Sequence, residues 1–333
     1  MTRTLIYVSC GEGREIDVFS LTDQGDVCWR QRVPTAGMSV PMRVRAESGR
    51  LYAGMREANR LAVYAIAAES GELSLLGEVA TPGAPVYVFC DRDLRVAFCP
   101  SYSDNNLSVF PLDAQGIPLA ASQVLHNLPR AHAARLDASG RWLLVPMLGA
   151  DGIRIYRLKD DLHLEPDDLP IILGRPGSGP RHPVFSSDNR FVYCLNELDG
   201  SIDVFAFDDT RGALQLEQTI SIMPEGFVAA PWTAELRLTP DGRHLYASDR
   251  RSSTVAALVV DKQSGRLTLV DHFSTENQPR GMDIDPSGKW LVVAWQQSAH
   301  LSVYAIDPIS GRLSLRRRHE TGRDPICVEV AVI

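Results

Sequence analysis

The sequence predicts an all-β fold, a seven-bladed β-propeller of four-stranded antiparallel blades, and three observations support this prediction. First, a segment mostly of the form apolar-x-Val-aromatic, followed by a polar turn and Leu-x-Leu, recurs along the 333 residues. Second, successive copies lie 45, 46, 46, 49, 53 and 46 residues apart, which is typical of repeat architectures. Third, the two ends of the chain each carry part of one blade. The copies, the sixth degenerate, occupy residues 16–19, 61–64, 107–110, 153–156, 202–205, 255–258 and 301–304.

Each copy alternates apolar and polar side chains, which predicts a half-buried β-strand, the third strand of its blade. An apolar run before it predicts the second strand, as at 51–53 and 142–144. Before that run comes a polar turn with Gly or Asn, as at 138–140 and 240–242. These residues tolerate positive φ and predict a hairpin from a first strand. The Leu-x-Leu segment supplies the fourth strand.

The chain ends predict how the ring closes. Residues 5–8 have the pattern of a second strand that no first strand precedes, and residues 327–330 have that of a spare first strand. We therefore expect the C-terminal strand to join the N-terminal blade and to complete a single domain that spans residues 1–333. A pair of β-sandwiches is the alternative all-β fold, and the regular spacing argues against it.

Composition narrows the functional classes. The net charge of −7 leaves no basic surface for a nucleic acid. The N-terminus enters a strand at once, with no apolar signal region or membrane-length span, so we expect a cytoplasmic protein without a membrane partner. The six cysteines are scattered and include no Cys-x-x-Cys pair, which predicts reduced cysteines in the core. Nothing in the sequence indicates an oligomeric state.

The two rims of the predicted ring differ in character. Turns between first and second strands, and between third and fourth, are stereotyped, and hairpin chemistry alone explains them. Loops before the first strands and after the second strands lie on the opposite rim and depart from the repeat. Their polar and aromatic residues predict a ligand site. These residues include Arg130, His132, Arg181, His182, Asn196, Glu197, Trp232, Asp249, Arg250 and Arg280.

Arg181 and Glu197 are the first candidates. Arg181 begins one predicted strand and Glu197 ends the next, and their separation of sixteen residues returns the chain to the same height, so both can line one pocket. Structural roles are the alternative: the arginines can pair with carboxylates at the channel mouth, Glu197 can bridge two blades, and the histidines can bind backbone groups. The convergence of such residues on one rim favours the functional interpretation.

Several kinds of chemistry have no support in the sequence. It contains no Gly-x-Ser-x-Gly nucleophile elbow, no Gly-rich phosphate loop between strand and helix, and no His-Glu-x-x-His motif. Asn196, Glu197 and Asp249 offer oxygen ligands for Ca²⁺, which is a weaker alternative. The sequence thus predicts acid–base chemistry without a metal or cofactor, acting on a small, oxygen-rich anion.

The motifs on this rim resemble those of the seven-bladed propeller lactonase family, which includes bacterial 6-phosphogluconolactonases and, more distantly, fungal 3-carboxymuconate lactonizing enzyme. The similarity runs through the chain and is densest from about 179 to 292. It implies a cytosolic lactone hydrolase of the pentose phosphate pathway. The muconate relatives imply that the catalytic residues are His132, Arg181, Glu197 and Arg280. The matching stretches are 179–182, 196–198, 223–225, 239–247, 249–250 and 278–281, with Tyr102 kept beside Ser101.

We therefore predict a sugar-lactone hydrolase, most similar to 6-phosphogluconolactonase, in which Glu197 or His132 is the general base and Arg181 and Arg280 hold the anion and the developing oxyanion. The predicted substrate-binding residues are His182, Asn196, Trp232, Asp249, Arg250 and Tyr102. Residues 226–231 depart from the charged segment of the bacterial enzyme. This departure keeps open a lactonase or lactonizing cycloisomerase for an unphosphorylated carboxylate-bearing compound. A non-catalytic scaffold is a second alternative.

Overall fold

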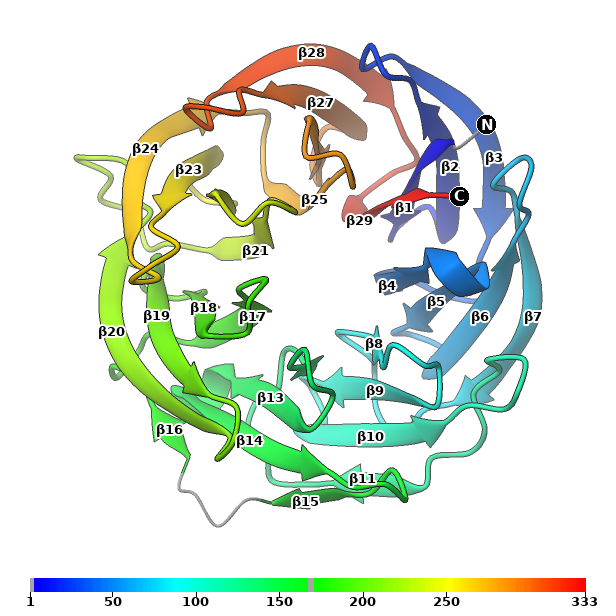
Figure 1. The fold of residues 1–333 in the computed structure, drawn as a ribbon. Coiled ribbons are helices and arrows are strands. Elements are labelled where there is room, and N and C mark those ends of the chain that lie inside the picture. The colour runs from blue at the N-terminus through cyan, green and yellow to red at the C-terminus, as the bar shows by residue number, and fades with distance from the viewer. Residues whose placement is uncertain (1–2, 167–170) are drawn as a thin grey trace.

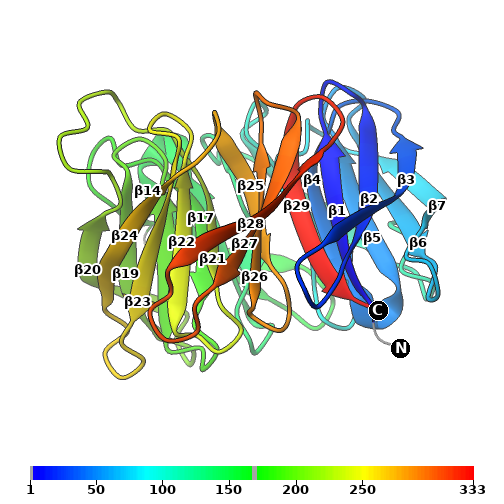
Figure 2. The same cartoon turned by 90° about the horizontal axis from the view of Figure 1, so that it is seen from above.

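The structure is a computed structural model that describes residues 3–166 and 171–333. Seven sheets form a closed ring around a central axis (Figure 1). The predicted seven-bladed propeller is confirmed. The side view shows a flat disc, with both termini on the same rim (Figure 2). None of the helices in the described ranges is long and apolar enough to cross a membrane.

The strands of each blade run from the axis outward. The first blade contains β29 (Pro325–Val332), β1 (Thr4–Cys10), β2 (Glu15–Leu21) and β3 (Val27–Pro34). The second contains β4 (Ser39–Arg45), β5 (Arg50–Met55), β6 (Arg60–Ile66) and β7 (Leu73–Ala80). The third contains β8 (Phe89–Cys90), β9 (Val96–Ser101), β10 (Asn106–Pro111) and β11 (Gln123–Leu125).

The fourth blade departs from four strands, because a fifth strand pairs with β14. It contains β12 (Arg135–Leu136), β13 (Trp142–Met147), β14 (Gly152–Leu158), β15 (Leu164–Pro166) and β16 (Ile172–Leu173). The fifth contains β17 (Pro180–Phe185), β18 (Phe191–Asn196), β19 (Ser201–Asp208) and β20 (Ala213–Ser221). The sixth contains β21 (Thr233–Leu238), β22 (His244–Asp249), β23 (Thr254–Val260) and β24 (Leu267–Ser274). The seventh contains β25 (Pro279–Ile284), β26 (Trp290–Trp295), β27 (His300–Ile306) and β28 (Leu313–Glu320), and two short 3₁₀ helices are η1 (Ala46–Ser48) and η2 (Leu148–Ala150).

The ring closes as predicted. Strand β29 pairs antiparallel with β1, in a register that runs from Thr4 opposite Val332 to Cys10 opposite Pro325. Arg3 and Ile333 exchange backbone hydrogen bonds of 3.0 Å next to this pair. The first and last parts of the chain therefore share one sheet, which leaves β1 without a free edge.

The core lies between neighbouring blades. One cluster, for example, packs Phe98 and Val109 of the third blade against Leu143 and Val145 of the fourth. Strand β18 is buried along its whole length, whereas the outermost strand β28 is mostly exposed. The stack of blades thus removes both faces of the inner strands from water, which supplies the main driving force for the fold.

The prediction that the repeat strands are half-buried was wrong. Their polar positions are also buried: Asp17 and Ser302 are 0% exposed and Asp203 is 3% exposed. Because a buried charge needs a partner, each carboxylate is paired, Asp17 with Arg32 at 2.7 Å and Asp203 with Arg175 at 2.7 Å. Successive side chains of a repeat strand point alternately toward the two neighbouring blades, and both blades cover the face that they contact.

The predicted hairpin turns are confirmed. Gly140, Asn189, Gly242 and Gly288 have φ of 71°, 62°, 69° and 73°, so each occupies the left-handed region that the turn requires. The six cysteines are all free. Four of them are buried and Cys327 is partly buried, but Cys28 is exposed, so the expectation of core cysteines was wrong for that residue.

Candidate active site

The candidate site begins at an irregularity in β17. Pro180 pairs with Asn196 and His182 with Leu195, so Arg181 is the extra residue of a β-bulge. A bulge re-aims side chains, and here two consecutive residues, Arg181 and His182, line the same cavity. The site ends of β4, β21 and β25 carry comparable register shifts. The inner strands therefore become irregular at the rim where the sequence departs from its repeat.

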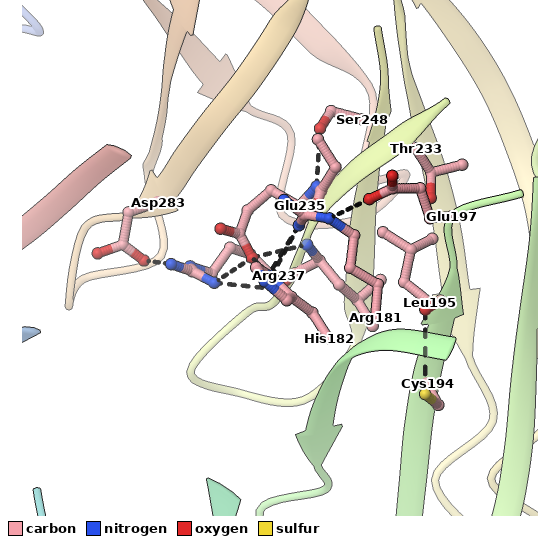
Figure 3. Close-up of polar contacts among 12 residues, drawn as sticks. Arg181, His182, Cys194, Leu195, Glu197, Thr233, Glu235, Arg237, Ser248 and Asp283 are labelled. Atoms are coloured by element: carbon pink, nitrogen blue, oxygen red, sulfur yellow. Dashed lines mark hydrogen bonds and ion pairs between the residues drawn. The ribbon is translucent and has the colours of Figure 1, made fainter. Parts of the chain in front are cut away.

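Glu197 lies between two arginines. Its Oε2 accepts a hydrogen bond of 2.7 Å from Arg181 Nε (Figure 3). The same oxygen lies 3.2 Å from an Nη of Arg250. Arg250 is held in turn by the carbonyls of Trp232 and Thr233 and lies 3.8 Å above the Trp232 ring. Burial favours the neutral acid, but the two guanidiniums outweigh it and keep the pKa of Glu197 below its usual value.

His182 is paired with Glu235, a residue of the neighbouring blade. Its Nδ1 lies 2.9 Å from Glu235 Oε1 (Figure 3). Burial first, and then the Arg181 charge, lower the pKa of His182 to about 4. Burial opposes ionisation of Glu235, but Arg237 and His182 outweigh it and lower the pKa of Glu235 to about 2. At neutral pH a neutral imidazole thus faces a carboxylate, which assigns the proton to Nδ1 and leaves Nε2 unprotonated.

Arg181 packs directly against the His182 ring. Its Nη1 lies 3.2 Å from Nδ1 and 3.1 Å from Nε2, and it also donates to the carbonyl of Ala234. Nearly equal distances to both ring nitrogens place the guanidinium against the ring, without a single dominant hydrogen bond. The cation therefore opposes protonation of His182.

A second neutral histidine lies beside the first. The His132 ring centroid is 5.1 Å from that of His182 and 5.8 Å from that of Tyr102. Burial, followed by the charge of Arg181, holds the pKa of His132 well below its usual value. Its Nδ1 is buried and has no hydrogen-bond partner among the described residues. Two uncharged imidazoles are thus held edge to face at this rim.

Arg280 provides a cation with a free guanidinium. It is half-buried on β25 and lines a narrow cavity of about 40 Å³ together with Arg181 and His182. Within the described part of the chain, no carboxylate lies within ion-pair distance of it. Burial, and then Arg181, lower the pKa of Arg280 to about 10, so it stays charged at neutral pH. An unpaired, partly desolvated guanidinium next to another arginine favours an anionic ligand.

One group of described residues places three potential metal ligands within 4.8 Å of one another, and it lies away from this rim cavity: Cys10, Glu15 and Asp17. The Asp17 carboxylate already accepts hydrogen bonds of 2.7 and 2.9 Å from Arg32 and one of 2.7 Å from the Gly322 N–H. Burial raises the pKa of Cys10 strongly, which favours the thiol over the metal-binding thiolate. We interpret the group as an ion pair of the first blade.

The sequence profile described as "Lactonase, 7-bladed beta-propeller" matches residues 4–330, which is nearly the whole chain. The chain belongs to this lactonase family. Two similar proteins are named 6-phosphogluconolactonase: one from Cronobacter sakazakii is 38% identical over 280 residues, and one from Serratia proteamaculans is 36% identical over 283 residues. These alignments cover 84% of both chains in the first case and 85% of both in the second.

Solved structures agree with this family. A periplasmic gluconolactonase of Pseudomonas aeruginosa superimposes with a TM-score of 0.92 at 28% identity, covering 99% of both chains. A protein of Lactobacillus plantarum superimposes with a TM-score of 0.90 at 25% identity and covers 99% of this chain and all of its own. The lactonase fold is therefore shared along the full length.

The lactonase rim gathers the predicted residues in three groups. Arg181, His182 and Arg280 line the cavity itself. Glu197, Arg250 and Trp232 lie behind Arg181, while His132 stacks against His182 and Tyr102 stacks against His132. Asn196 and Asp249 serve their own loops. The Asn196 amide donates to Ser201 and Asp203, and the Asp249 carboxylate accepts the N–H groups of Trp232, Arg251 and Ser252.

Sequence reasoning missed Glu235, Arg237 and Tyr87, which line the same cavity. Glu235 and Arg237 alternate with apolar residues along β21, and Arg237 joins Glu235 at 2.6 Å to Asp283 at 2.9 Å. Their spacing could have identified Glu235 and Arg237, because two opposite charges two residues apart on a first strand both face the channel. They belong to no motif and lie outside the irregular loops, so the sequence prediction did not include them.

Proposed function

We propose that this chain hydrolyses a sugar lactone at the Arg181–His182–Arg280 cavity, with 6-phosphogluconolactone as the best candidate substrate. The observation that carries the proposal is the pairing of a neutral His182 with Glu235 directly beside the guanidiniums of Arg181 and Arg280. A base and two cations around one small cavity fit an ester carbonyl that acquires negative charge during hydrolysis. The two relatives named 6-phosphogluconolactonase support the substrate class.

In the proposed reaction, His182 Nε2 takes a proton from water while the water oxygen bonds to the lactone carbonyl carbon. Arg181 and Arg280 stabilise the resulting oxyanion. The C–O bond of the ring then breaks, and the ring oxygen takes a proton, either returned by His182 or relayed by His132. The product is a hydroxy acid, which releases its carboxyl proton to solvent.

This proposal changes the role that the sequence suggested for Glu197. A carboxylate paired with two guanidiniums has a lowered pKa and is a weak base. We infer that Glu197 positions Arg181 and Arg250 instead. Trp232 and Tyr102 remain proposed substrate contacts at the rim, and we propose that Asn196 and Asp249 shape the loops that carry them. We further propose that residues 1–333 act as one domain in the cytoplasm.

A second candidate is a lactonase for an unphosphorylated sugar lactone. The structural similarity to a gluconolactonase favours it, and so does the uncharged segment 226–231 between Glu225 and Trp232. The experiment that decides is initial-rate hydrolysis by the purified protein of 6-phosphogluconolactone, gluconolactone and a muconolactone, each with and without EDTA. We expect 6-phosphogluconolactone to give the highest kcat/KM, unchanged by EDTA. Turnover of none of these lactones would overturn the proposal.

A further inference from the structure

Three arginines gather around one aromatic ring in the axial channel, next to the lactone site, whose cavity Arg43 also lines. The guanidinium carbons of Arg43, Arg45 and Arg135 lie 5.7, 5.7 and 5.1 Å from the centroid of the Phe89 ring. Arg43 and Arg45 come from β4, Arg135 from the start of β12, and Phe89 from β8. Inner strands of three consecutive blades thus bring three like charges together. We call Arg43, Arg45 and Arg135 the arginine cluster.

The arginine cluster lacks matching carboxylates. Arg43 reaches only Glu329, at 3.6 Å, and Glu329 also faces Arg237 at 3.8 Å and accepts the Val44 N–H at 2.9 Å. Arg45 and Arg135 form no ion pair within the described residues. The nearby carboxylates of Glu235 and Asp283 are taken by Arg237. The four arginines Arg43, Arg45, Arg135 and Arg237 thus face only three carboxylates, those of Glu235, Asp283 and Glu329, so about one positive charge stays uncompensated among these half-buried side chains.

Unused hydrogen-bond donors point to the same conclusion. The Nε atoms of Arg43 and Arg45 are buried and have no hydrogen-bond partner in the part of the chain that the structure describes. Most buried polar atoms in native proteins are hydrogen-bonded, so two orphan donors of the same charge in one place call for an acceptor. Burial, and after it the charge of Arg43, lower the pKa of Arg45, and burial is also the main cause of the lowered pKa of Arg135. An anion between the guanidiniums would relieve both effects.

The channel offers space for such an anion. Arg43, Arg135 and Tyr87 line an internal cavity of about 160 Å³, far more than the roughly 10–15 Å³ that one water needs. Arg43 and Arg45 also line a second cavity of about 620 Å³, whose walls include Glu47 and Pro286. These two residues belong to turns between first and second strands, so this cavity opens on the rim opposite Arg181. The cluster is thus reachable without passing the lactone site.

We propose that the arginine cluster is a second anion site, which takes a small tetrahedral oxyanion such as phosphate or sulfate. Three guanidiniums present several N–H donors with the fork geometry that suits these oxygens. His182 and Glu235 line the same 160 Å³ cavity, so its occupant acts electrostatically on the lactone site. The shared chemistry fits a free anion from the far rim or the phosphoryl group of a substrate. A substrate phosphoryl group would have to reach the cluster through the narrow cavity of about 40 Å³ beside Arg181, so we favour the free anion.

The test is calorimetric titration with inorganic phosphate, in the absence of any lactone, so its result is independent of the proposed activity. Wild type is compared with Arg135→Gln, with Arg280→Gln in the lactone cavity, and with Arg211→Gln, whose side chain is 82% exposed, as a matched loss of charge. We expect Arg135→Gln to weaken phosphate binding at least about tenfold, because it removes a charge-assisted donor pair. Arg211→Gln should stay within about twofold, whereas Arg280→Gln shows how much phosphate binds in the lactone cavity instead. Absence of phosphate binding to the wild type, or equal affinity in Arg135→Gln, would overturn the proposal.

Thermal melting provides a second readout that does not depend on affinity. In phosphate-free buffer we expect Arg135→Gln to melt above the wild type, because it removes one of three like charges held close together around the Phe89 ring. Phosphate should raise the melting temperature of the wild type and not that of the variant. A variant that melts lower in both buffers would show a structural role for Arg135 and would contradict the site. Arg45→Gln repeats the comparison at an independent position.

Kinetics then identify the source of the anion. If free phosphate is the ligand, it should change turnover of phosphorylated and unphosphorylated lactones alike, and this effect should vanish in Arg135→Gln. If the ligand is the phosphoryl group of the substrate, Arg135→Gln should lower kcat/KM for the phosphorylated lactone alone. Either result supports a site at the cluster, whereas Arg135→Gln kinetics that match wild type for both lactones at every phosphate concentration would contradict it.

Discussion

His182 is chemically unusual because its surroundings keep it neutral while a carboxylate orients it. Arg181 and burial disfavour its proton, whereas Glu235 fixes which nitrogen carries the proton of the neutral ring. The acid–base assignment of the site follows from these two opposing neighbours.

The pH dependence of the reaction tests this assignment. Since only the neutral imidazole is a base, and its pKa is about 4, we expect kcat/KM to stay level from pH 7 to 5 and to fall as the pH passes below about 4. An unperturbed histidine would already lose activity near its ordinary pKa of about 6.5. A pH–rate profile of the wild type measures this, and a midpoint near 6.5 would contradict a buried, neutral base.

Replacement of Glu235 separates orientation from charge. Glu235→Gln should lower kcat about 10- to 100-fold with little change in KM, because the proton on His182 Nδ1 loses its ionic acceptor. The acidic midpoint should move to lower pH, since the carboxylate raises the pKa of His182. Asp283→Asn, which removes the other close partner of Arg237, is the matched control and should change kcat less. Equal losses in both variants would indicate a general effect on packing.

Arg280 should act on binding of the anion. Arg280→Gln removes a guanidinium that no described carboxylate neutralises and that holds the developing oxyanion, so we expect kcat/KM to fall about 10- to 100-fold, through kcat as well as KM. Steady-state kinetics measure the change. Arg250→Gln provides the contrast. Arg250 already forms an ion pair with Glu197 and hydrogen bonds to two carbonyls, so its loss should first disturb the position of Glu197.

The sequence predicted part of this residue-scale picture. Arg181, His182 and Arg280 were predicted because they interrupt a repeat, and the structure brings them to one cavity. Glu235 was not predicted, because it lies within a predicted first strand and outside the loops that depart from the repeat. Its partner His182 lies 53 residues away in the chain, and only packing of the fifth blade against the sixth brings the two together.

At the scale of elements, the site depends on bulges at the rim ends of the inner strands. The sequence predicted that a strand begins at Arg181, and the structure begins β17 one residue earlier, at Pro180. The sequence did not predict the register shifts at β17, β21 and β25. A bulge has no fixed sequence signature, and it is decided by which side chains the neighbouring blades can accept.

Gly281 on β25 tests how closely an inner strand must approach the closing strand. A Cβ at this position would lie 2.7 Å from Cys327 Cα and 2.7 Å from the Ile326 carbonyl oxygen, both backbone atoms of β29. Gly281→Ala should therefore lower stability by about 1–3 kcal/mol, as overpacking does. Gly77→Ala is the control, because its Cβ would meet only Ile117 Cγ2, at 3.0 Å. Thermal melting compares the two, and an unchanged melting temperature for Gly281→Ala would refute the close approach.

At the scale of the whole molecule, the ring is held by noncovalent pairing of its two ends. The chain ends predicted this closure, because each carried an incomplete blade. The fifth strand of the fourth blade was not predicted. It lies in the stretch between repeat copies that are 49 residues apart, and such an insertion carries no repeat signal that fixes its conformation.

Removal of residues 325–333, which contain β29, tests the closure. The truncated chain would expose the edge of β1 and uncover core residues such as Val8 and Ile6, which are 0% exposed in the intact ring. We expect loss of cooperative melting and association through the free edge, since an unpaired strand edge recruits other chains. Circular dichroism melting and size-exclusion chromatography measure both effects. A truncated monomer that melts like the full chain would show that the ring does not need its last strand.

The central claim is that His182 is the base of a lactone hydrolase, and kcat/KM for 6-phosphogluconolactone in wild type and His182→Asn tests it most directly. Asparagine keeps a hydrogen-bonding group near Glu235 but cannot accept a proton, so we predict a loss of about 10²–10⁴-fold. A variant that keeps wild-type kcat/KM with unchanged melting temperature would contradict the claim.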